Sequence, residues 1–134
     1  MVKSIFLHGL IAGVLSGVAG AIYQMIYQEM YFVDFSPVVN LTAIMASSII
    51  GCMLMAVGYF CLFKIKKMNL IGWLNIIYTL LAFISILPAM AATLPLDVEF
   101  PEIFPGMVVP MHFFPAVAFF ALSPFFINQS TKVV

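Results

Sequence analysis

Long apolar runs separated by short polar stretches dominate the pattern of this chain. Four of the runs are long enough for a helix, at about 1.5 Å per residue, to cross the hydrocarbon core of a bilayer. The connections are short, so successive helices are expected to lie antiparallel. The sequence predicts an all-α membrane protein, an up-down bundle of four transmembrane helices forming a single domain, 1–134. The predicted spans are residues 4–28, 39–63, 70–93 and 107–127.

The first predicted span carries small residues along one side. Gly9, Gly13 and Gly17 follow one another at intervals of four, and Gly20 lies on the adjoining ridge. Glycine costs about 1 kcal/mol relative to alanine in a water-soluble helix. In lipid, the same spacing gives a smooth surface that another backbone can approach closely. This face is therefore predicted to be a helix-packing surface.

The second predicted span has a ridge of small residues of its own, which we expect to pack against the glycine face. Its members are Ala43, Ser47 and Gly51. The last two spans contain prolines instead. Pro88 and Pro115 each remove a helical hydrogen bond, to the carbonyls four residues earlier, so a kink is expected near Pro88 and an unpaired carbonyl before Pro115.

Charged residues divide cleanly between the two ends of the predicted spans. The lysines precede the first span, lie between the second and third, or follow the fourth: Lys3, Lys64, Lys66, Lys67 and Lys132. The acids occupy the other two connections: Glu29, Asp34, Asp97, Glu99 and Glu102. The positive-inside rule then places both termini in the cytoplasm. We expect the plasma (inner) membrane of a bacterium, with the first span retained rather than cleaved as a signal peptide.

The composition narrows the class of function. With 65% hydrophobic and 7% charged residues, the chain has too little polar surface for a soluble domain of this length. Its net charge is zero, so a nucleic-acid partner is not expected. No charged residue lies near the middle of a predicted span, unlike most proton-coupled carriers. The expected partners are membrane lipid and a membrane protein or further copies of the chain, with no enzymatic activity and no cofactor.

A cluster of possible ligands gathers at the acidic end of the predicted bundle. Met107, Met111 and His112 open the fourth span, and Glu102 precedes them. Thioether and imidazole ligands suit copper(I), and a carboxylate attracts cations. Two polar side chains of the first span are expected to line the entrance to this site, namely Gln24 and Gln28. Packing by methionine is the simpler alternative for the same residues.

Three functional hypotheses follow. The first is a non-catalytic accessory or structural subunit that packs within a larger membrane complex or a homo-oligomer. The second is a transporter or binder of a small solute or metal ion that uses the Met/His/Glu cluster. The third is a haem- or quinone-binding protein, because imidazole is a common axial ligand. A single haem shared by His8 and His112 is not expected, since these residues fall at opposite ends of the predicted bundle.

Overall fold

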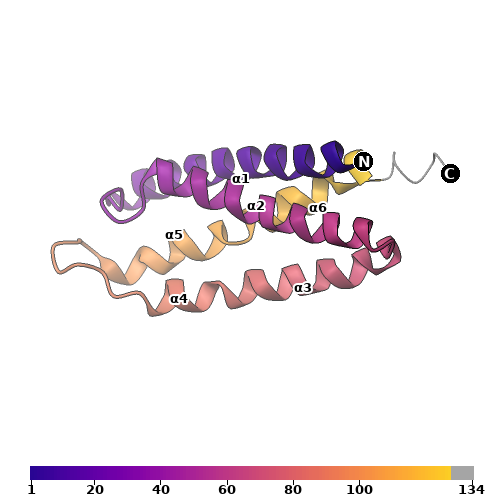
Figure 1. The fold of residues 1–134 in the computed structure, drawn as a ribbon. Helices are drawn as coiled ribbons and strands as arrows, with labels where there is room; N and C mark the ends of the chain where they lie inside the picture. The colour runs from indigo at the N-terminus through magenta and orange to yellow at the C-terminus, as the bar shows by residue number, and fades with distance from the viewer. Residues whose placement is uncertain (128–134) are drawn as a thin grey trace.

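The computed structural model describes residues 1–127, and within that range it is built from helices without a strand (Figure 1). This confirms the all-α prediction. The helices form four segments long and apolar enough to cross a membrane, which indicates an integral membrane protein. The first two segments are α1 (Val2–Tyr31) and α2 (Leu41–Lys64). The third contains η1 (Met68–Leu70), α3 (Ile71–Ile84) and α4 (Ile86–Ala91), and the fourth contains η2 (Pro101–Ile103), α5 (Phe104–Met111) and α6 (Phe114–Ile127).

Helices α1 and α2 form the most extensive contact in the molecule, and glycine makes it close. A Cβ atom added at Gly13 would lie 2.6 Å from the Cα atom of Ile49. One added at Gly9 would lie 2.8 Å from the Ala56 Cβ. Both distances are far below an ordinary carbon–carbon contact of about 3.5–4.0 Å. The absence of side chains on this face of α1 therefore lets the two backbones approach each other directly. Gly17 and Gly20 face Met45 and Ile44 in the same way.

The second ridge of small residues lies elsewhere than expected. A cavity on another side of α2 is lined by Ala43, Ser47 and Gly51. A Cβ atom added at Gly51 would have the Pro115 Cβ as its nearest neighbour, at 3.9 Å. The prediction that this ridge packs against the glycines of α1 is therefore wrong. Larger residues of α2, such as Ile49, occupy that interface, because a flat glycine surface accepts them without a matching groove.

Helix α6 is attached to α1 by hydrogen bonds from side chains to backbone carbonyls. The Ser4 hydroxyl donates to the Phe126 carbonyl at 3.0 Å, and His8 Nε2 bonds to the Phe119 carbonyl at 2.8 Å. Phe119 is fully buried and belongs to the hydrophobic core with Tyr59 of α2. The start of α1 and the end of α6 therefore lie at the same end of the molecule (Figure 1). Lys132 lies outside the described residues.

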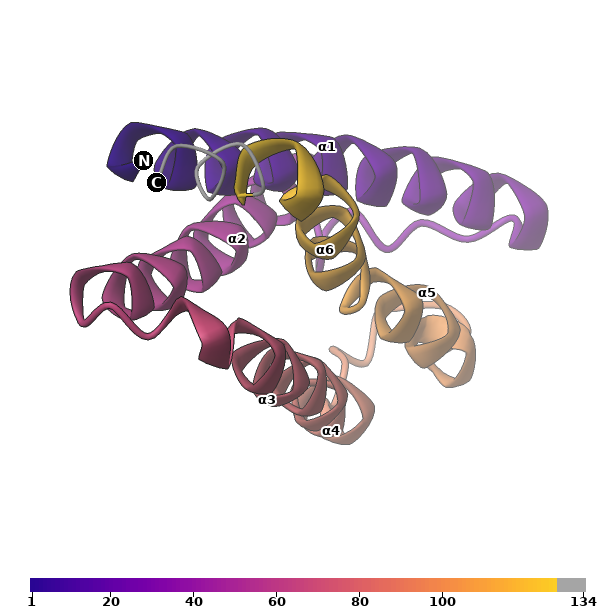
Figure 2. The ribbon, with the colours of Figure 1, turned by 90° about the vertical axis from the view of Figure 1, so that its right-hand side faces the viewer.

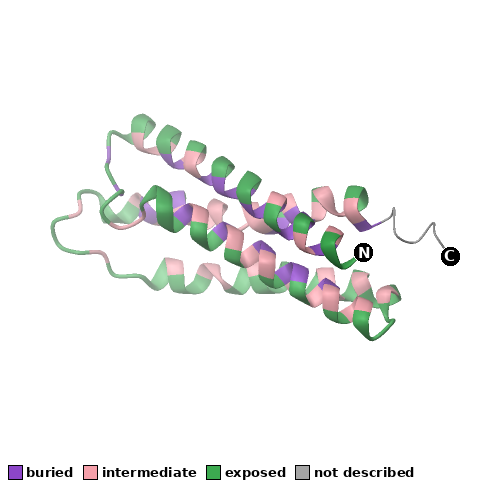
Figure 3. Cartoon of the chain, turned by 45° about the horizontal axis from the view of Figure 1, so that its top comes forward, coloured by how far each residue is buried: buried purple, intermediate pink, exposed green. Residues whose placement is uncertain are grey.

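The third segment is packed much more loosely than the others. No residue of α3 or α4 is buried, whereas buried residues gather where α1, α2 and α6 meet (Figure 3). Figure 2 shows α3 on the far side of the molecule from α1, with which it makes no contact. Most of its surface is left for lipid or for another protein.

Both of the last two segments are interrupted. The third breaks at Ser85, between α3 and α4, in the region where Pro88 predicts a kink. The fourth breaks between Met111 and Phe114. Its helical structure begins at Pro101, before the predicted start at 107, because prolines suit the first turn of a helix. Pro110 has no N–H to donate to the Gly106 carbonyl one turn earlier. The Tyr23 hydroxyl donates to that carbonyl instead, at 3.0 Å.

Candidate functional site

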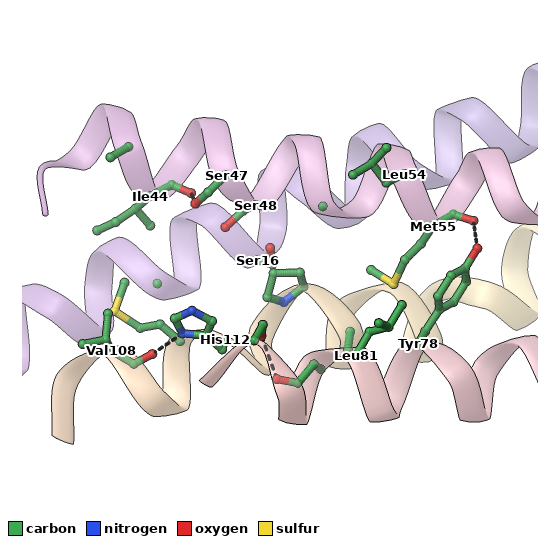
Figure 4. A pocket seen from close by; sticks show the side chains of 18 of the residues that line it. Ser16, Ile44, Ser47, Ser48, Leu54, Met55, Tyr78, Leu81, Val108 and His112 are labelled. Atoms are coloured by element: carbon green, nitrogen blue, oxygen red, sulfur yellow. Dashed lines mark hydrogen bonds between the residues drawn. The ribbon is translucent and has the colours of Figure 1, made fainter. Parts of the chain in front are cut away.

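A cavity of about 600 Å³ lies among the helices and is bordered by all four segments. Apolar side chains make most of its wall, and hydroxyl groups and one imidazole interrupt them (Figure 4). A cavity of this size and mixed character is typical of small-molecule sites in helical bundles. The side chains used in the argument below are Ser16, Ser47, Ser48, Tyr78, Ser85 and His112.

Both helix breaks border this cavity. Ser85 lies at the break between α3 and α4, and His112 lies at the break between α5 and α6. The rings of Phe83 and Phe113 pack edge to face, 5.0 Å apart, and so hold the two breaks beside each other. Within a membrane, interrupted backbone is tolerated where it faces protein or a cavity. Discontinuous helices are also the usual frame of binding sites in transporters.

The hydroxyl groups of the wall mostly donate their protons to backbone carbonyls. A hydroxyl that donates in this way keeps its oxygen lone pairs available to a neighbour. Ser48, which is nearly buried, has no such bond among the described residues. The bonds run from Ser16 to Gly13 at 3.3 Å, from Ser47 to Ile44 at 3.1 Å, from Ser85 to Ala82 at 2.7 Å and from Tyr78 to Met55 at 2.9 Å.

The His112 ring supplies a further acceptor. Its Nδ1 atom lies 2.7 Å from the Val108 carbonyl, one turn earlier. A carbonyl oxygen can only accept, so Nδ1 carries the proton, and in the neutral ring Nε2 is left as an acceptor. Figure 4 shows the ring at the cavity wall, with this second nitrogen turned toward α2. Among residues 1–127, no Lys, Asp or Glu lines the cavity.

The two glutamines predicted to line an entrance serve the connection between α1 and α2 instead. Gln24 is buried and donates through Nε2 to the Val39 carbonyl at 2.5 Å. When the oxygen and nitrogen of the Gln28 side-chain amide are interchanged, the amide oxygen accepts from the Phe35 backbone N–H at 2.7 Å. Both side chains therefore fix the course of the chain after α1, and neither lines the cavity.

The other members of the predicted outer cluster lie in different surroundings, although Met111 packs against the apolar group that contains Met107. Met107 is fully buried against Phe35 and Phe104, and Glu102 is exposed. Met111 and His112 alone reach the cavity. Among residues 1–127, no group of three His, Cys, Asp or Glu residues is placed to hold a metal ion. The metal site predicted from Met107, Met111 and His112 rests on thioether as well as imidazole ligands, and it stays a prediction.

His8 occupies a closed site at the other end of the molecule. Its ring is fully buried and stacks on Phe119 and Phe126, with centroid distances of 4.1 and 5.3 Å. Its Nε2 atom is engaged by the Phe119 carbonyl, and its Nδ1 atom is buried without a partner. Aromatic rings surround His8, so its imidazole contributes to the packing between α1 and α6.

Sequence reasoning missed most of the polar wall. Ser48, Tyr78 and Ser85 did not stand out, because an isolated hydroxyl residue in an apolar helix ordinarily bonds to its own backbone. A usable signal was available in the prolines, since Pro88 and Pro115 predict two interrupted helices close to Ser85 and His112.

We compared the chain with protein-family models, curated proteins and solved structures, and none matches it.

Proposed function

We propose that this membrane protein binds a small, mainly apolar molecule in the cavity between its four helical segments, without catalysing a reaction. The observation that carries the proposal is the cavity itself, with two broken helices at its wall. Its apolar lining favours a molecule that partitions into the bilayer. The few polar groups would orient that molecule. This develops the small-solute hypothesis and moves its site from the acidic end of the bundle to a cavity between the helices that opens to the surface beside Leu54 and Leu81.

An accessory-subunit role is a second proposal, supported by the loose packing of α3 and α4. These helices bury no residue within the chain, and large side chains such as Trp73 and Leu87 are exposed. Lipid alone can cover such a surface, since it is as apolar as the side chains. Sizing and mass spectrometry of gently extracted protein would distinguish the two. A stoichiometric protein partner supports the subunit role, and a lone chain counts against it.

We also propose that both termini face the cytoplasm of a bacterial inner membrane. The turn between α2 and α3 carries Lys64, Lys66 and Lys67, and the connections at the opposite end carry the acids. Fusions of green fluorescent protein and alkaline phosphatase to the C-terminus test this orientation. Fluorescence without phosphatase activity is the expected result, and the reverse result would overturn it.

The binding proposal is tested by filling the cavity. Gly51 borders the cavity, and a Cβ there meets nothing closer than 3.9 Å, so a leucine side chain would extend into the empty volume. Gly72→Leu is the matched control, because nothing lies within 4 Å of its Cβ position. The probe is 4-octylphenol carrying a diazirine in its alkyl chain, photolysed with the protein in lipid nanodiscs.

Peptide mass spectrometry then locates the labelled residues. We expect adducts on cavity residues such as Met55 and Met111, which excess unlabelled 4-octylphenol suppresses. Gly51→Leu should lose these adducts, while Gly72→Leu keeps them at the wild-type level. Labelling that is spread over the lipid-facing side of α3, or that is unchanged in Gly51→Leu, would refute binding in the cavity.

A further inference from the structure

We infer that the molecule bound in the cavity is a neutral amphiphile whose polar end is a hydrogen-bond donor, namely an alcohol or a phenol. This inference rests on the proposed binding function and specifies the ligand class. It starts from a count of donors and acceptors at the cavity wall. Most hydroxyl groups there already donate to backbone carbonyls of the protein. The groups left to bond with a ligand are therefore mainly hydrogen-bond acceptors.

The hydroxyl groups show this imbalance first. Ser47 and Ser85 donate to carbonyls of their own helices at 3.1 and 2.7 Å, and Tyr78 donates across to α2 at 2.9 Å. A ligand that needed a proton from one of them would break an existing bond and leave a carbonyl without its partner. Each such loss opposes binding. A ligand that is itself a hydrogen-bond donor can donate to a lone pair of one of these oxygens, and the existing bonds to the carbonyls are kept.

His112 is the acceptor best placed to receive that proton. Its Nδ1–H is held by the Val108 carbonyl at 2.7 Å, which fixes the tautomer and leaves Nε2 with a lone pair. The ring also lies at a helix break, where α5 ends and α6 has not begun. Ser48 can serve a ligand as donor or acceptor, so a hydroxyl that donates to His112 could also accept one bond.

Charge sets the other limit on the ligand. The part of the chain that the structure describes places no Lys, Asp or Glu at the cavity, and apart from the hydroxyl groups and the imidazole its wall is apolar. A carboxylate or phosphate would face oxygen and nitrogen lone pairs, which repel it. An ammonium group would enter an apolar wall without a counter-ion, at a large desolvation cost. A ketone or quinone could accept a hydrogen bond from Ser48 but would leave the His112 Nε2 acceptor unpaired, so the reduced hydroxyl form of such a pair is the form that this wall favours.

The test compares two probes of nearly the same shape. 4-Octylphenol and its methyl ether, 4-octylanisole, differ in the donor and in one added methyl group, and both can compete with the diazirine probe in nanodiscs. We expect the phenol to compete about tenfold more strongly, as the loss of one buried hydrogen bond predicts. In His112→Phe, which keeps an aromatic ring, the ratio should fall below about threefold, and competition by the ether should not change.

Each outcome has a distinct meaning. Equal competition by phenol and ether in the wild type overturns the donor inference and leaves the proposed binding function intact. Failure of both probes to compete overturns the inference and the binding function together. A preference for the phenol that persists in His112→Phe overturns the assignment of His112 as the acceptor. Unchanged competition by the ether in that variant shows that the cavity has kept its shape.

Discussion

The contact between α1 and α2 makes a quantitative prediction for Gly13→Ala. The added Cβ would lie 2.6 Å from the Ile49 Cα atom. Restoring an ordinary contact of about 3.5 Å requires the two helices to separate by about 1 Å at that point. Because the neighbour is backbone rather than the end of a flexible side chain, it cannot swing aside. Overpacking of this kind costs about 1–3 kcal/mol.

Gly72→Ala is the control, since its Cβ would meet nothing within 4 Å. Gly13 lies in the middle of α1 and Gly72 in the first turn of α3, so helix propensity favours Gly13→Ala at least as much as Gly72→Ala, by about 1 kcal/mol or less. The difference between them isolates the steric term. We expect Gly13→Ala to be less stable than Gly72→Ala by about 1–3 kcal/mol.

The measurement is unfolding by sodium dodecyl sulfate in mixed micelles, followed by circular dichroism and analysed as a free energy of unfolding. Gly51→Ala is a second control, because its Cβ would lie 3.9 Å from the Pro115 Cβ, which is an ordinary contact distance. It should behave like Gly72→Ala. If Gly13→Ala and Gly72→Ala agree within about 0.5 kcal/mol, which is the usual effect of a surface change, the close backbone contact does not determine stability.

Three further predictions concern other parts of the molecule. His8→Phe keeps the ring stacking and removes both the bond to the Phe119 carbonyl and the buried, unpaired Nδ1 atom; because the carbonyl loses its partner, unfolding should become easier by about 1 kcal/mol in the same assay, and no loss would mean that removing Nδ1 outweighs the bond. Asn40→Ala removes the side chain that accepts the Ala43 N–H at 2.9 Å, and should cost about 0.5–2 kcal/mol, with Asn40→Asp retaining most of the stability. Hydrogen bonds from Ser36 lower the pKa of Asp34 below its ordinary value of 3.8. A depressed pKa means that the carboxylate stabilises the connection above that value and loses the effect as the pH falls through the folded-state pKa; carbon NMR of labelled aspartate should show this, and Ser36→Ala should raise the pKa.

The helical segments could be predicted because each depends on local information. A run of apolar residues determines a span by its own length, and a proline interrupts a helix wherever it lies. The segments therefore match the predicted spans closely. The exception is the start of the fourth, where Pro101 and Pro105 read as loop residues but occupy first helical turns.

The cavity could not be predicted in the same way, because it depends on how the faces of different helices are paired. Gly13 and Ser47 are both small residues at a spacing of four, yet one lies in a tight interface and the other lines an empty volume. Nothing in the sequence distinguishes these two environments. The methionines near Glu102 show the same limit, since Met107 fills an apolar core while Met111 reaches the cavity.

The bonds between α1 and α6 have a consequence for biosynthesis. Ser4 and His8 bond to carbonyls 122 and 111 residues later in the chain. A chain made from its N-terminus inserts α1 long before α6 exists. During that interval the imidazole of His8 must rest near the lipid headgroups or bind water, because the bilayer interior offers no partner. Formation of α6 is thus the step that gives the His8 side chain of α1 its partner.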